Sequence, residues 1–127
     1  MAKVLPQITD AEWDVMKVLW ERGHAVAAQD VTEALAVERN WRPQTVKTLL
    51  NRLVKKGAVA YAEEGRRFLY RPKVSKDAVV RAETRSFLSR VFDGAVTPAL
   101  VHFLKIADLS KADIEELKRT LDRESKP

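Results

Sequence analysis

The sequence predicts a mainly α-helical fold with one small β-hairpin, divided into two domains within 127 residues. Two observations predict this fold class: apolar residues recur at helical spacing in several stretches, and two short extended runs flank a glycine. The length allows one well-buried core, or a small domain with an appended oligomerisation segment. Because 46% of the residues are hydrophobic, the chain can offset the entropy of ordering and is not expected to be disordered.

The first predicted helix begins at a capping box, in which the Thr9 side chain bonds the amide of Glu12 and Glu12 reaches back. Gly23 supplies its end. A short second helix is expected over residues 28–37, with no good side-chain cap at its start. The apolar face of the first helix, which we assign to the core, consists of Trp13, Val15, Met16, Leu19 and Trp20.

The third predicted helix, over residues 42–56, has the clearest pattern. Pro43 suits the first turn, where its missing N–H is not needed, and Gly57 ends the helix. Its single apolar stripe consists of Val46, Leu49, Leu50, Leu53 and Val54.

A β-hairpin follows. Residues 59–62 and 67–70 are predicted strands joined by the four-residue connection 63–66, and Pro72 ends the second strand. Three helices followed by a two-stranded hairpin is the order of a winged helix-turn-helix domain, which we place at residues 1–73.

Residues 74–127 are expected to form a three-helix dimerisation domain. Ser75 can cap a helix that runs to Phe92, Thr97 and Pro98 open the next helix, and a capping box at Ser110 begins the last. Three small amphipathic helices bury little by themselves, so we expect a second copy of the chain to cover them. The residues assigned to this dimer interface are Val80, Phe87, Leu88, Val91, Phe92, Leu100, Val101, Leu104, Ile114, Leu117 and Leu121.

Charge and the helix periodicity together point to a nucleic-acid partner. Residues 39–73 carry ten Lys or Arg against two Asp or Glu, whereas residues 1–38 carry three against seven. With the leucine stripe turned inward, the polar side of the third helix is free to enter a major groove. The expected base-reading residues are Arg42, Gln44, Thr45, Lys47 and Thr48. The expected phosphate and wing contacts are Asn51, Arg52, Lys55, Lys56, Arg66 and Arg67. The alternatives left open are a solvated basic surface and a winged-helix module that binds another protein without DNA specificity.

Other function classes lack support in the sequence. There is no cysteine, so disulfides and thiolate chemistry are excluded. His24 and His102 belong to no metal-ligand motif, and no phosphate loop or nucleophile elbow occurs. We therefore expect no enzyme activity, cofactor or metal. With no apolar run of membrane-span or signal-peptide length, we expect a cytoplasmic protein that does not insert into membranes.

Four segments, taken together, resemble the penicillinase-repressor family (BlaI/MecI/CopY). They are the opening run Leu5–Trp13, the helix Arg42–Gly57, the wing strand Arg67–Tyr70 and the segment Asp108–Leu117. The resemblance covers nearly the whole chain, and the combination of segments is specific although each alone is weak.

The resemblance implies a homodimer that binds an inverted-repeat operator on double-stranded DNA and represses transcription. In the antibiotic-resistance members, a membrane metalloprotease sensor system triggers cleavage of the repressor between asparagine and phenylalanine. The corresponding bond of this chain is His102–Phe103, with histidine in place of the asparagine, and a protease of such a system is the implied partner. Copper-responsive members carry C-terminal cysteine motifs, which this chain lacks.

Overall fold

The structure is a computed structural model that describes residues 5–125. The outermost residues of the two expected domains, 1–4 and 126–127, lie outside this description. Contacts divide the chain into two compact units, residues 1–82 and 83–127, which meet within a helix. The described elements, in chain order, are α1 (Asp10–Arg22), β1 (Val26–Ala27), α2 (Ala28–Arg39), α3 (Pro43–Lys56), β2 (Val59–Glu64), β3 (Arg67–Pro72), α4 (Lys76–Phe92), α5 (Val96–Ile106) and α6 (Lys111–Glu124).

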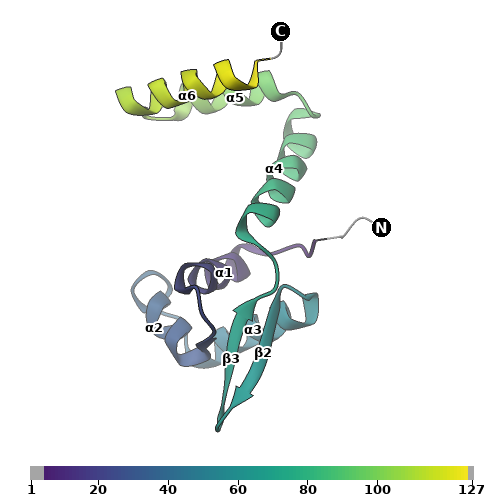
Figure 1. Cartoon of the computed structure of the whole chain (residues 1–127), viewed down its shortest axis with the longest axis vertical. Coiled ribbons are helices and arrows are strands. Elements are labelled where there is room, and N and C mark those ends of the chain that lie inside the picture. The colour runs from purple at the N-terminus through teal and green to yellow at the C-terminus, as the bar shows by residue number, and fades with distance from the viewer. Residues whose placement is uncertain (1–4, 126–127) are drawn as a thin grey trace. The chain divides into compact units, whose positions relative to one another are not determined.

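The core of the first unit lies between α1, α2, α3 and the root of the sheet. Figure 1 shows these helices grouped beside that root, while the turn of the hairpin projects away from them. The core side chains are close-packed and come from every element of the unit through β3; they are aliphatic except for Tyr70 of β3. They include Val15, Met16, Leu19, Val31, Val46, Leu50, Leu53 and Val59, each almost fully buried.

Local sequence signals set the boundaries of the first three helices. The Thr9 N–H donates to Glu12 Oε1 at 3.0 Å and the Glu12 N–H donates to Thr9 Oγ1 at 3.2 Å, which confirms the predicted capping box. Gly23 ends α1 at φ 71°, a conformation that costs glycine little. At the start of α2, the Asp30 carboxylate accepts the Ala27 N–H at 3.3 Å. This contact stands in for the side-chain cap that the sequence lacks, and α2 runs to Arg39, two residues beyond its predicted end.

The sheet has three strands in the order β1-β3-β2, and the sequence analysis missed β1. Val26 pairs with Tyr70 in an antiparallel register, so β1 adds two residues to the hairpin edge. The predicted four-residue connection is also wrong. Glu63 and Glu64 continue the ladder opposite Phe68 and Arg67, which leaves only two residues, 65 and 66, in the turn.

The first turns of α4 belong to the first unit. The Trp20 indole N–H donates to the Val74 carbonyl at 2.9 Å, and the Lys73 N–H donates to the Ala58 carbonyl at 2.8 Å. Val79 is only 2% exposed. The segment that leaves the hairpin is therefore anchored to α1, through Trp20, and to the residues between α3 and β2, through Ala58.

The second unit is built from the rest of α4 with α5 and α6. The Ser110 side chain accepts from the Asp113 N–H at 3.1 Å, as the predicted capping box requires. In return the Ser110 N–H donates to the Asp113 carboxylate at 3.0 Å, and this backbone hydrogen bond, together with the Ser110 side chain, lowers the pKa of the Asp113 carboxyl. The predicted cap at Thr97 is wrong, since α5 begins at Val96 and its N-cap is Ala95. The earlier start is compatible with Pro98, because this proline still falls in the first turn, where no N–H is needed.

Within residues 5–125, no helix is both long and apolar enough to cross a membrane.

Candidate nucleic-acid interface

Helix α3 divides its residues between the core and solvent as its periodicity predicts. Val46, Leu50 and Leu53 have no exposed surface and Leu49 is 5% exposed. Val54 is the exception in the predicted stripe, since it is only partly buried at the edge of the core. The opposite side presents a continuous row of exposed polar residues, which we call the polar row: Arg42, Gln44, Thr45, Lys47, Thr48, Asn51, Arg52 and Lys55.

Within the polar row, one hydroxyl is held by the helix backbone. Thr48 Oγ1 donates its proton to the Gln44 carbonyl at 2.9 Å. Because Thr48 is exposed, its oxygen can still accept a hydrogen bond from a base edge and its methyl group can contact a thymine methyl. Thr48 cannot easily donate a hydrogen bond to a base, because its proton is already used by the Gln44 carbonyl.

The beginning of α3 suits an anion. Arg42 occupies the N-cap without a side-chain cap, and Pro43 lacks an N–H. No acidic residue stands in the first turn. Partial positive charge at a helix N-terminus, with an exposed guanidinium beside it, favours a nearby phosphate.

Lys56 differs from the other cations expected to hold phosphate. Its ammonium donates to the Glu12 carboxylate, with which it forms an ion pair, and to the Gln7 carbonyl at 2.9 Å. The Glu12 side chain is 1% exposed, whereas that of Lys56 is 32% exposed. The structure therefore places Lys56 between α3 and the start of α1, away from the polar row.

The ionised form of Glu12 is favoured despite its burial. Desolvation by itself raises the pKa of this carboxyl, but the Lys56 ammonium and the Thr9 backbone amide outweigh it and hold the pKa below the usual value. Glu12 Oε2 is buried without a hydrogen-bond partner among the described residues. The charge of Glu12 thus depends on one cation 44 residues away in the sequence.

The wing carries two expected DNA contacts at its turn. Arg66 follows Gly65, whose φ of 65° is the left-handed conformation that tight hairpin turns need, and Arg67 begins β3 opposite Glu64. Both arginines are exposed. A hairpin tip with two free guanidinium groups can reach a phosphate or an adjacent minor groove.

Next to α3, the wing also carries aromatic residues that the sequence analysis used only as strand formers. Tyr61 and Phe68 are 54% and 45% exposed. Burial and the neighbouring Tyr61 raise the pKa of Tyr70, so its hydroxyl stays neutral. No sequence signal indicated this placement, because it depends on the strand register and on the position of the hairpin beside α3.

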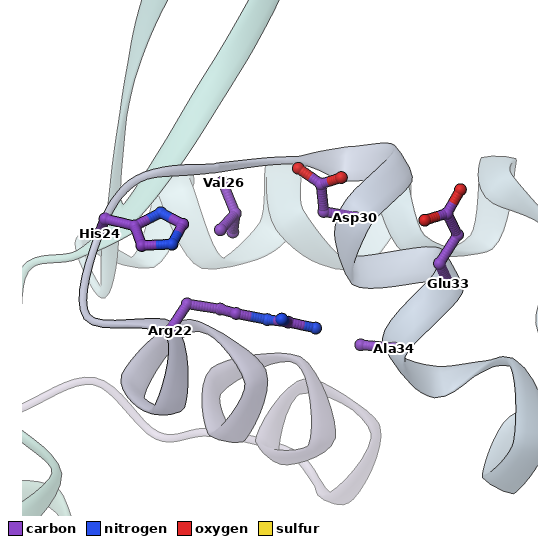
Figure 2. Close-up of a pocket in the computed structure, with 6 residues that line it drawn as sticks. All are labelled: Arg22, His24, Val26, Asp30, Glu33 and Ala34. Carbon is purple, nitrogen blue, oxygen red and sulfur yellow. The ribbon is translucent and has the colours of Figure 1, made fainter.

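A separate pocket of about 440 Å³ lies between the end of α1 and α2. Figure 2 shows the Arg22 side chain extending from α1 toward α2, with His24 on the connecting loop and Asp30 and Glu33 on α2. His24 Nδ1 lies 3.0 Å from the Ala25 carbonyl. Among the described residues there is no cluster of three groups able to hold a metal ion.

In the second unit, the bond between His102 and Phe103 lies inside α5. The His102 ring packs 5.6 Å from the Phe92 ring, and the Phe103 ring stacks 6.1 Å from that of Phe87. Proteases prefer exposed loops, and this bond is instead held within a hydrogen-bonded helix.

The residues expected to form a dimer interface are mostly exposed in the single chain. Val80, Val91, Leu100, Val101, Leu104, Ile114, Leu117 and Leu121 have exposed fractions between 39% and 60%, and Phe87, Leu88 and Phe92 are partly buried. Phe103 and Ile106, which the sequence analysis did not include, are exposed at 45% and 81%. In the described part of residues 83–127, Ala99 is the one buried hydrophobic residue.

Three helices around a small core, of which the third has one polar exposed face, together with a short sheet define a winged helix-turn-helix protein. Comparison with known sequences narrows this class. The penicillinase repressor family model matches residues 8–123, and the chain belongs to that family.

Individual relatives agree with the family match. A penicillinase repressor from Bacillus licheniformis is 37% identical over 120 residues, which are 94% of this chain and 93% of the relative. The methicillin resistance regulatory protein MecI from Staphylococcus aureus strain N315 is 30% identical over 117 residues, covering 92% and 94%. The resemblance predicted from four segments is therefore confirmed.

Solved structures agree for the first unit. The solution structure of the DNA-binding domain of the repressor BlaI matches with a TM-score of 0.51 and 42% identity, covering 59% of this chain and 90% of that one. The Bacillus licheniformis BlaI monomer in complex with the blaP half-operator matches with a TM-score of 0.51 and 41% identity, covering 60% and 92%. These matches confirm the predicted winged-helix fold.

Proposed function

We propose that this chain is a transcriptional repressor that binds an inverted-repeat operator as a homodimer, with α3 in the major groove. The observation that carries the proposal is the division of α3 into a buried aliphatic side and an exposed polar row. The width of an α-helix matches the major groove, where each base pair presents a distinct pattern of donors and acceptors.

The relatives support the DNA part of this proposal. BlaI, which is similar over the first unit, has been solved with a half-operator, and the family takes its name from repressors. The concentration of positive charge over residues 39–73 supplies the electrostatic attraction that DNA binding requires. A module that only docks on other proteins would have no need of this charge beside α3.

The second unit supports the homodimer. Its large apolar side chains stay exposed in a single chain, which is unfavourable in water at about 25 cal/mol per Å². A second copy presenting the same helices would cover them, and an isologous pair places two copies of α3 on two half-sites.

Roles within the polar row follow from position. The polar-row residues of the first turns, from Arg42 to Thr48, reach base edges. Asn51, Arg52 and Lys55 hold the DNA backbone that flanks those bases. Arg66 and Arg67 act from the wing. Lys56 holds α3 against α1 and contributes little to phosphate binding, because Glu12 neutralises it.

Selection from random-sequence duplexes tests the proposal directly. The intact chain is expected to enrich an inverted repeat with half-sites about one helical turn apart, or a multiple of that distance. Enrichment of no sequence, or of a single half-site bound by one chain, would contradict the proposed operator-binding dimer.

Two variants should distinguish residues that recognise bases from residues that bind phosphates. Thr48→Val keeps the methyl group but removes the acceptor, and we expect it to lower discrimination at particular base pairs by about 5- to 150-fold. Lys55→Ala should weaken binding to every sequence and reduce the slope of log affinity against log salt by about one. Fluorescence titrations on the selected and on scrambled duplexes measure both effects.

The exposed Lys118 on α6 offers a charge-matched control for Lys55. Lys118→Ala removes the same charge from a helix of the second unit, to which we assign no DNA contact, and should leave the salt slope unchanged. Equal losses for Lys55→Ala and Lys118→Ala would show that only net charge matters, and the assigned role of Lys55 would then be wrong.

A further inference from the structure

The wing has an aromatic cluster with two exposed rings. Tyr61 lies opposite Tyr70 in the β2–β3 register, and the Phe68 ring meets the Tyr61 ring edge-on with centroids 5.3 Å apart. Tyr70 is buried, whereas Tyr61 and Phe68 leave about half of their surface in water. Covering such rings with a binding partner is energetically favourable, because it removes apolar surface from water.

These rings form one wall of a pocket of about 310 Å³ between the wing and the end of α3. The residues that line it are Asn51, Val54, Lys55, Tyr61, Phe68 and Tyr70. Asn51 and Lys55 also belong to the polar row, so the pocket is continuous with the surface that we propose faces DNA. It therefore joins apolar ring surface to one ammonium and one amide group.

The geometry of a duplex indicates what would occupy this pocket. A single sugar-phosphate strand separates each major groove from the neighbouring minor groove. If α3 lies in the major groove and the wing tip reaches the adjacent minor groove, that strand passes between them. The pocket lies between the same two elements.

The chemistry of the lining agrees with this occupant. A deoxyribose offers an apolar face that can pack on an aromatic ring, and a phosphate accepts hydrogen bonds from an ammonium and an amide. Both halves of the sugar-phosphate unit thus find a complementary group within one pocket.

We infer that the pocket between α3 and the wing binds the sugar-phosphate backbone of duplex DNA, with Tyr61 and Phe68 against deoxyribose and Lys55 and Asn51 on the adjoining phosphate. The inference rests on the proposed function. It adds an apolar contact that is independent of base sequence. This contact is also insensitive to salt, because covering a sugar releases no counterion.

One acidic residue shares the aromatic face. Glu63 lies two residues beyond Tyr61 on β2 and pairs with Phe68, so its side chain points to the same side of the sheet. Glu63 is exposed. A backbone phosphate on this face would be repelled by the Glu63 carboxylate, which makes this residue an independent probe.

The first test removes both exposed rings in the intact chain. Tyr61→Ala/Phe68→Ala should weaken binding about tenfold on the selected operator and on a random-sequence duplex of equal length, since losing roughly 60 Å² of apolar contact has this effect. The salt slope should not change. Val37→Ala, at a side chain that is 96% exposed on α2, is the matched control and should bind as the unaltered chain does.

The second test is Glu63→Gln, which should tighten binding to both duplexes by about threefold at low salt, with a smaller gain at high salt. This exposed substitution decides the point even where the double variant fails to fold. Unchanged affinity for Glu63→Gln, or wild-type affinity for a folded double variant, overturns the inference. If the unaltered chain selects no sequence at all, the proposed function itself fails; if it selects one and the wing variants bind unchanged, only this inference fails.

Discussion

Replacing Lys56 by methionine is expected to lower the free energy of unfolding by about 3–5 kcal/mol, because it leaves the Glu12 carboxylate buried without a counter-charge. Glu12 has no route to solvent, since its side chain is 1% exposed and its position is set by the capping box with Thr9. Urea denaturation of the unaltered chain and of Lys56→Met measures the difference.

The same variant should reverse the sign of the pH dependence. In the unaltered protein the pKa of Glu12 is lowered, so its contribution to stability is complete above the unfolded value and is lost as pH falls through the folded value. Without Lys56, burial raises the pKa of Glu12, and stability should instead fall as pH rises above the ordinary carboxyl range. Denaturation curves from pH 4 to 7 measure whether the free energy of unfolding rises or falls with pH. The expected difference between the two proteins arises from the ionisation of one group, Glu12.

Glu12→Gln provides the control. The glutamine still accepts the Thr9 N–H, and Lys56, with 32% of its side chain exposed, can turn to solvent. Glu12→Gln should therefore cost far less than Lys56→Met, and adding it to Lys56→Met should recover most of the loss. A Lys56→Met protein that is within about 1 kcal/mol of the unaltered one would show that the ion pair has no structural role.

Ending the chain after Ala82 should give a folded monomer that binds the full operator about 10²- to 10⁴-fold more weakly, because the two half-sites are no longer bound by one tethered pair. Residues 1–82 keep the Trp20–Val74 hydrogen bond and the buried Val79. Sedimentation and titrations on full and half operators measure the two effects.

A chain that ends after Lys73, the predicted domain boundary, is the informative comparison. It loses the carbonyl that accepts the Trp20 indole N–H and also the buried Val79, so we expect it to be less stable than residues 1–82 by about 2–4 kcal/mol. Equal stability would place the folding boundary at residue 73. A dimer formed by residues 1–82 would contradict the assignment of dimerisation to the second unit.

Most of the first unit could be predicted from the sequence because its signals are local. The capping box at Thr9, the glycines after α1 and α3, and the aliphatic stripe of α3 each act within a few residues. The stripe also identified the polar row, since the two sides of one helix are defined by the same periodicity. Sequence reasoning was least accurate at the hairpin turn and at the start of α5, where the sequence allowed more than one boundary.

The sequence by itself thus determined the helices, the exposed side of α3 and the family, because periodicity, caps and motifs are properties of short segments. Only the tertiary structure decided that Lys56 faces Glu12, that Trp20 holds Val74, that β1 joins the sheet, and that the wing aromatics lie beside Asn51 and Lys55. Each of these contacts joins residues far apart in the chain. Their partners are chosen by the packing of whole elements and not by any local preference.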